Sequence, residues 1–231
     1  ITSGGNYNVV VGDEAGTAIT TGDNNVAVGF EALATEDTGT SSVAIGYQAL
    51  KTQNNDAENY NIAIGSLAGA SVTTGVRNTI VGGLSADSIT TGQYNTVLGF
   101  GTLTNETSGS ASTAVGYLAL SAQNTEATNY NTAVGYEAGK AVTTGVQNTL
   151  IGALAGDALT DADNNVAVGR SALSADTLGS RSVAIGMQAL AAQNFTTATD
   201  AFNVAVGQNA GLSVTTGVQN TLVGGLAGDA L

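Results

Sequence analysis

Apolar residues recur along this chain in a short phrase that closes on a glycine. Two copies are Val26–Gly29 and Val43–Gly46, and each follows an Asn or a Ser. β-Branched residues at alternate positions favour a β-strand, because strand side chains point to opposite faces with a period of two. The phrase therefore predicts a strand of about five residues that ends at the glycine.

The phrase fills the whole chain at a nearly constant spacing. Successive copies are mostly 17 residues apart, and three steps of 19, 19 and 21 residues interrupt this period. The closing glycines are Gly12, Gly29, Gly46, Gly65, Gly82, Gly99, Gly116, Gly135, Gly152, Gly169, Gly186, Gly207 and Gly224. A repeat this short buries its apolar face only against its neighbours. We predict an all-β fold, a parallel β-solenoid of about thirteen coils of 17–21 residues stacked in register.

A longer period lies on top of the first, because every fourth copy is closely similar. The segment Val72–Thr79 returns as Val142–Thr149 and as Val214–Thr221. We predict one repeat domain over residues 1–231, a fragment of a longer fibre. Its super-repeats are 9–78, 79–148, 149–220 and a partial 221–231.

The two strand faces differ in size, and the difference leads to a prediction about packing. We expect large residues such as Val26 and Val28 to fill the coil, and Ala27 to face outward, where a second chain covers it. Asn precedes most copies, and we expect these side chains to form a stacked amide ladder. Its members are Asn8, Asn25, Asn61, Asn78, Asn95, Asn131, Asn148, Asn165, Asn203 and Asn220. Each closing glycine is expected to adopt a positive φ or to allow a close backbone approach.

Composition excludes several classes of function. The 231 residues include no His and no Cys, so neither a thiolate or imidazole metal site nor a Ser-His-Asp triad exists. A net charge of −13 argues against nucleic-acid binding. No apolar run approaches the roughly 18 residues of a membrane span, so we expect no membrane insertion.

Three longer connections occupy one place in the super-repeat and are the candidate contact sites. They are 51–60, 121–130 and 191–202. Insertions in a solenoid form loops on one side, which is often the binding side. The candidate receptor contacts are Tyr60, Tyr130, Phe195, Phe202 and Lys51. The alternative is that each aromatic ring only fastens its loop to the coils.

Other chemistry remains open as alternatives. Acidic pairs such as Asp13–Glu14 and Asp161 with Asp163 leave Ca²⁺ binding open, although none matches a known calcium loop. Paired carboxylates also leave a polysaccharide-processing enzyme open. A column of threonines that includes Thr79 leaves ice binding open, but we expect this column to point inward. A catalytic site is usually one irregular patch, whereas this chain repeats almost the same unit thirteen times. We therefore expect no enzymatic activity, and we expect no cofactor.

The phrase also resembles known repeats. Asn/Ser-Val-Ala-Ile-Gly followed by Ala resembles the YadA-like head repeats of trimeric autotransporter adhesins, and it is similar to the β-roll repeats of bacteriophage tail fibres. Val43–Leu50 and Thr132–Gly139 carry the likeness. The resemblance implies a left-handed β-roll, a homotrimer and a role in surface attachment. The adhesin repeat is shorter, and neither a heptad stalk nor membrane-anchor strands appear in this sequence.

These observations lead to one expectation about function. We expect a non-enzymatic structural and adhesive segment of an extracellular trimeric fibre, which contacts a host receptor or polysaccharide. A phage tail fibre on the virion surface ranks first. A bacterial surface adhesin head and a self-assembling extracellular filament are the alternatives.

Overall fold

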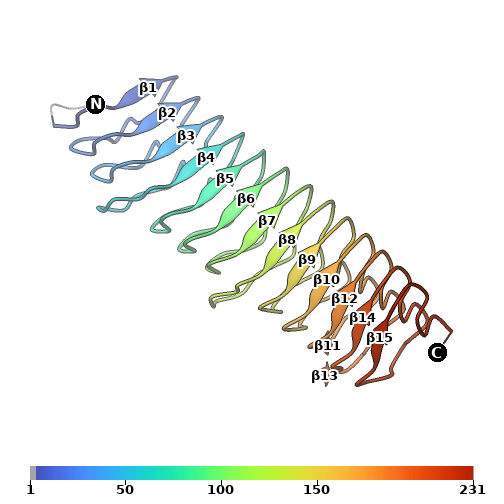
Figure 1. The fold of residues 1–231 in the computed structure, drawn as a ribbon. Helices are drawn as coiled ribbons and strands as arrows, with labels where there is room; N and C mark the ends of the chain where they lie inside the picture. The colour runs from blue at the N-terminus through green and yellow to red at the C-terminus, as the bar shows by residue number, and fades with distance from the viewer. Residues whose placement is uncertain (1–3, 231) are drawn as a thin grey trace. The chain divides into compact units, whose positions relative to one another are not determined.

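The computed structural model describes residues 4–230, and this range holds strands and turns but no helix (Figure 1). The chain divides into two compact units. Unit 1 comprises residues 1–112 with 124–127, and unit 2 comprises 113–123 with 128–231. Each unit is a parallel β-solenoid.

One three-residue strand marks each coil. The strands of unit 1 are β1 (Val9–Val11), β2 (Val26–Val28), β3 (Val43–Ile45), β4 (Ile62–Ile64), β5 (Thr79–Val81) and β6 (Thr96–Leu98). Those of unit 2 are β7 (Thr113–Val115), β8 (Thr132–Val134), β9 (Thr149–Ile151), β10 (Val166–Val168), β12 (Val183–Ile185), β14 (Val204–Val206) and β15 (Thr221–Val223). A second, two-stranded sheet pairs β11 (Gly179–Ser180) with β13 (Thr199–Asp200).

Successive coils stack in register, as the sequence predicts. In the pairing of β2 with β3, Val26 lies opposite Val43, and Ala27 lies opposite Ala44. Equivalent positions of neighbouring coils therefore meet throughout each sheet. The strands are shorter than the five residues expected, because only the three residues before the glycine have ladder partners.

The expectation about the two strand faces is wrong. Ala63 in β4 is fully buried, whereas its neighbours Ile62 and Ile64 are 38% and 37% exposed. The same alternation with a buried middle residue occurs in strands such as β2, β5 and β9, whereas the middle residue of the end strands β1 and β15 is half-buried. The small residue points inward, and the large β-branched pair points outward.

The reason lies on the opposite wall of the coil. The fourth residue after the glycine is often a buried leucine, such as Leu33 or Leu50, and it fills the space that an alanine leaves. Where the inward strand residue of one coil is large, the residue of the preceding coil that faces it from the opposite wall is small. A Cβ on Gly69 would lie 2.9 Å from Cδ1 of Ile80, and one on Gly211 would lie 2.8 Å from Cδ1 of Leu222. Interior volume is thus conserved between the two walls.

The closing glycines have the positive φ expected of them, and most of them also lie close to the backbone of the next coil. Gly82 has φ +141°, and a Cβ there would lie 2.6 Å from the carbonyl carbon of Gly99 in the next coil. All thirteen have φ between +128° and +146°. An L side chain is excluded by backbone conformation and by the stacking distance together.

Candidate functional site

The outward face of the strands is apolar and carries no charge. The residues three and one before each glycine are only Val, Ile, Leu or Thr in all thirteen copies. Ile45, Ile62, Leu98 and Ile151 are among the large apolar side chains exposed here. Charged residues normally cover a soluble surface, and interface cores are depleted in them. We call these two outward columns the strand face.

Five consecutive coils place a threonine in the strand face, and Thr221 in β15 occupies the same column. Thr79 and Thr96 are exposed, and Thr113, Thr132 and Thr149 are half-exposed. The structure records no side-chain hydrogen bond for any of the five among residues 4–230. Their outward direction contradicts the expectation that this column points inward, and it removes that objection to ice binding. We call these five residues the face threonines.

A second column of threonines behaves in the opposite way. Thr73 Oγ1 donates to the carbonyl of Thr90 at 3.2 Å, and Thr90 Oγ1 donates to that of Thr107 at 2.9 Å. Thr143 and Thr160 repeat this arrangement in unit 2. These hydroxyls join one coil to the next, so they are committed to the fold. The face threonines are not.

Aromatic rings stack along one border of the strand face, directly after the glycine. The centroids of Phe30 and Tyr47 are 5.7 Å apart with 13° between the ring planes, and those of Tyr117 and Tyr136 are 5.4 Å apart with 15°. All four rings are exposed. Stacking along the coils fixes their orientation, and it extends the apolar surface beyond the strands.

Three of the five candidate receptor contacts are exposed aromatic rings. Tyr60, Tyr130 and Phe202 each precede a strand. The Tyr60 hydroxyl donates to Glu58 Oε2 at 2.9 Å, and this hydrogen bond raises the pKa of Tyr60. The Arg181 guanidinium lies 5.5 Å from the centroid of Phe202.

The other two candidates are engaged within the chain. Phe195 is only 6% exposed, and its ring occupies the coil interior beside Gly179. Phe195 is therefore a core residue, so its ring is not exposed as a receptor contact would require. Lys51 Nζ pairs with Glu31 Oε2 at 2.7 Å, and the hydrogen bond from Lys51 lowers the pKa of Glu31.

The asparagine column lies inside the coils, but its hydrogen bonds run mainly to the backbone. Asn25 Oδ1 accepts from the Ser42 N–H at 2.9 Å, and Asn25 Nδ2 donates to the Gly39 carbonyl at 2.9 Å. Direct amide-to-amide bonds also occur, as from Asn95 Nδ2 to Asn78 Oδ1 at 3.2 Å. The side chain thus satisfies backbone groups of the following coil that would otherwise be buried without partners.

A buried carboxylate anchors each longer connection, and sequence reasoning missed this role. Glu36 is fully buried. Its Oε1 accepts from the Gly39 N–H at 2.8 Å, and its Oε2 accepts from Gln53 Nε2 at 2.9 Å and Asn59 Nδ2 at 3.0 Å. Gln53 also donates to Ser42 at the ladder position where serine replaces asparagine.

The same arrangement recurs with small changes. Glu106 accepts from the Gly109 N–H at 2.7 Å and from the Thr125 N–H at 3.2 Å. Asp176 accepts from Gln193 Nε2 at 2.6 Å and from the Phe195 N–H at 3.0 Å. The signal in the sequence is an acid seven residues after a glycine, followed one coil later by glutamine.

The acidic pairs do not gather into larger acidic clusters in the part of the chain that the structure describes. No group of three or more acidic residues there is arranged to hold an ion. Glu36 and Asp37 are adjacent in the sequence like the other acidic pairs, but Glu36 is buried in the coil interior. No helix that could cross a membrane occurs among residues 4–230.

Asp157 is a carboxylate in an unfavourable place. Burial raises its pKa, and its Oδ1 is buried without a hydrogen-bond partner. The folded state therefore favours the protonated form, so acidification stabilises the fold through this group. We expect Asp157→Asn to raise the free energy of unfolding at pH 7 by up to about 0.5 kcal/mol. Urea unfolding should show that the gain in free energy of unfolding shrinks at acid pH, where the Asp157 carboxylate is protonated. A gain that is the same at every pH would show that the charge of Asp157 is not its cause.

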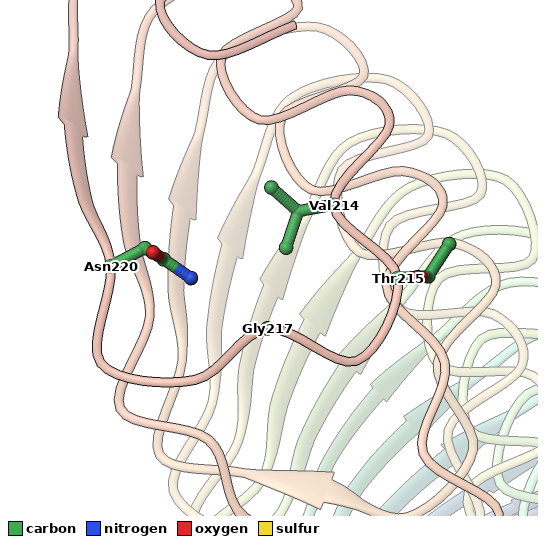
Figure 2. A pocket seen from close by; sticks show the side chains of 4 residues that line it. All are labelled: Val214, Thr215, Gly217 and Asn220. Carbon is green, nitrogen blue, oxygen red and sulfur yellow. The ribbon is translucent and has the colours of Figure 1, made fainter. Parts of the chain in front are cut away.

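A hollow of about 220 Å³ lies at the last complete coil of unit 2 (Figure 2). Val214, Thr215, Gly217 and Asn220 line it. Val214 and Asn220 occupy columns that are interior in the preceding coils, where Val142 and Asn148 are fully buried by the coil that follows. The hollow is thus an uncovered section of coil interior and not a built binding site.

Comparison of the chain with models of protein families, with curated proteins and with solved structures finds no match. The functional argument therefore rests on the residues and on the geometry described above.

Proposed function

We propose that this chain is a non-enzymatic structural and adhesive segment of an extracellular fibre in which three copies associate through the strand face. The observation that carries the proposal is the uncharged apolar strand face on a chain with a net charge of −13. Like charges repel copies at any other surface, whereas this face has no charge to oppose contact.

The size of the strand face supports association. At about 4.8 Å between strands and about 3.3 Å per residue, the three-residue strands cover about 290 Å² in projection in unit 1 and about 330 Å² in unit 2. A lone soluble protein rarely exposes a larger apolar patch. The stacked aromatic rings at its border add further area. The resemblance to trimeric repeats supports the number three and favours a virion fibre over a bacterial surface adhesin.

The attachment role rests on the three longer connections, 51–60, 121–130 and 191–202. Tyr60, Tyr130 and Phe202 present exposed rings next to exposed polar residues, and such rings stack on sugars while amides and carboxylates hydrogen-bond them. We assign these three residues as contacts for a host receptor or polysaccharide. New reducing ends after incubation with host polysaccharide would instead support the enzymatic alternative.

The assembly is tested by sedimentation of the full chain. We expect a trimer mass, and Ile64→Asp should dissociate it, because each buried carboxylate would lie near two others without a partner. Ile64 is exposed in the single chain, so the coil itself should remain folded by circular dichroism. The matched control is Thr91→Asp, an exposed site whose column holds Asp161 in unit 2.

A monomeric wild-type chain would contradict the trimer and favour a second candidate function. The face threonines form a regular outward column, which is the feature that made ice binding an alternative. Thermal hysteresis by a monomer, abolished when the face threonines become valine, would establish that candidate. A trimer without thermal hysteresis would exclude it.

A further inference from the structure

A column of side chains lies two residues before each main strand, five residues before the closing glycine. Tyr60, Tyr130 and Phe202, the assigned contact residues, belong to this column. In unit 1, three consecutive coils place Tyr60, Arg77 and Tyr94 in it, and all three side chains are exposed. An arginine therefore lies one coil away from each of two exposed tyrosines.

Arg77 is held against the ring of the next coil. Its guanidinium carbon lies 5.6 Å from the centroid of Tyr94, and its Nη1 donates to the Tyr94 hydroxyl at 3.1 Å. The hydrogen bond with Glu58 raises the pKa of Tyr60, and the charge of Arg77 opposes this rise. The charge thus acts on both neighbouring tyrosines. Because stacking holds the guanidinium in place, a ligand that binds it immobilises little further.

Arg77 has no carboxylate partner within the described chain. Among residues 4–230, Lys51, Lys140 and Arg181 each pair with a carboxylate, and Arg77 and Arg170 do not. Of these two unpaired arginines, Arg77 is the one that stacks on an aromatic ring. A guanidinium carries five N–H donors, and only one of them is committed to a tyrosine hydroxyl. The remaining donors are available to an acid from outside the chain.

Arg181 in unit 2 shows a similar stack with a carboxylate already in place. It occupies the same column, and its guanidinium carbon lies 5.5 Å from the centroid of Phe202 in the next coil. Its Nη1 donates to Asp200 Oδ2 at 2.7 Å. The coil that follows Arg77 offers no such group, since residues 88–105 include neither Asp nor Glu. The place that Asp200 takes beside Arg181 is therefore left to an external carboxylate at Arg77.

We infer that Tyr60, Arg77 and Tyr94 form a binding site for a sugar that bears a carboxylate, such as a uronic or a sialic acid. The inference rests on the proposed attachment role, and it names the class of saccharide. Arg77 binds the carboxylate, because a guanidinium matches it with parallel N–H groups, and the tyrosines offer ring faces and hydroxyls to the sugar. A polyanion such as a nucleic acid is disfavoured by the net charge of −13.

Titrations of the full chain followed by saturation-transfer NMR test this site with two pairs of probes. The pairs are 3′-sialyllactose with lactose, and glucuronic acid with glucose. We expect at least one acidic probe to bind at least about tenfold more tightly than its neutral counterpart, because charge-assisted hydrogen bonds are added. Arg77→Gln should remove this preference. Glutamine stands at the matching positions Gln147 and Gln219, so this variant should fold normally.

The matched control is Arg181→Gln, which removes the same charge and a similar ring contact from unit 2. Because Asp200 already binds that guanidinium, we expect the affinity for the acidic probes to stay unchanged. Equal losses from the two variants would show that the overall charge of the chain, and not Arg77, attracts the acid. That result would overturn the inference.

The other outcomes separate this site from the proposed function. Equal binding of acidic and neutral probes, unaffected by Arg77→Gln, would overturn the carboxylate site and leave the exposed rings as contacts for neutral sugars. Inorganic phosphate that displaces the acidic probe at equal concentration would show an anion site without selectivity for sugars. Binding of no probe would overturn the inference and count against the attachment role. A monomer that binds the acidic probes would overturn the trimer alone.

Discussion

Gly82→Ala is expected to destabilise the coils of unit 1 by about 3–5 kcal/mol, because it combines two penalties. A φ of +141° lies outside the range that alanine adopts without strain, and the new methyl group would lie 2.6 Å from the carbonyl carbon of Gly99. That neighbour is backbone held by the stacking of the coils, so it cannot move aside alone. Urea unfolding followed by circular dichroism measures the loss.

Two other glycines, one next to Gly82 and one in the last coil of unit 2, separate the penalties. Gly83→Ala should change stability by less than about 0.5 kcal/mol, since its Cβ would meet Phe100 at 3.5 Å and its column holds Ala153 in unit 2. Gly224→Ala has the same kind of φ, +128°, but no atom nearer than 3.9 Å, so only the conformational cost of about 1–2 kcal/mol should appear. Equal losses at all three positions would refute the stacking explanation.

Removing the buried carboxylate of Glu36 is expected to cost about 3–5 kcal/mol. Glu36→Ala leaves the Gly39 N–H, Gln53 Nε2 and Asn59 Nδ2 buried without their acceptor. The loss should appear locally first, as faster amide hydrogen exchange at Gly39. Glu36→Gln should recover only part of it, because an amide places a donor against donors.

The control for this variant lies in the same connection. Glu58 is exposed, and the hydroxyl of Tyr60 is its recorded side-chain partner, so Glu58→Ala should change stability by less than about 0.5 kcal/mol. Comparable losses from Glu36→Ala and Glu58→Ala would show that the carboxylate is not the anchor of the loop.

Period and spacing were enough to predict the solenoid, the in-register stacking and the conformation of the closing glycines. These follow from one repeated phrase, because identical coils can bury their faces only against each other. A column of stacked asparagines was predicted, but on the outward face beside Ala27, whereas Asn25 is buried inside the coil, and its bonds to backbone groups depend on the path of the next coil. That path cannot be read from a single column of residues.

The direction of the strand faces was not predictable from the strand alone. Large residues fill most interiors, but here Leu33 and Leu50 enter from the opposite wall, with φ of +51° and +48°. Leucine rarely adopts such a backbone. The strand phrase gives no signal for those turns. The large strand residues were therefore wrongly assigned to the core in place of the leucines on the opposite wall. Phe195 was misassigned for a related reason, since its loop folds back into the coil.

Volume exchange between Gly69 and Ile80, and between Gly139 and Leu150, makes neighbouring coils unequal although their backbones superimpose in register. Removing the coil that holds Gly69, for example, would set Leu50 against Ile80, two bulky residues on facing walls. Removing four restores every match, as does adding four. We therefore expect insertions and deletions in this repeat to be tolerated best in steps of about seventy residues, the length of one super-repeat.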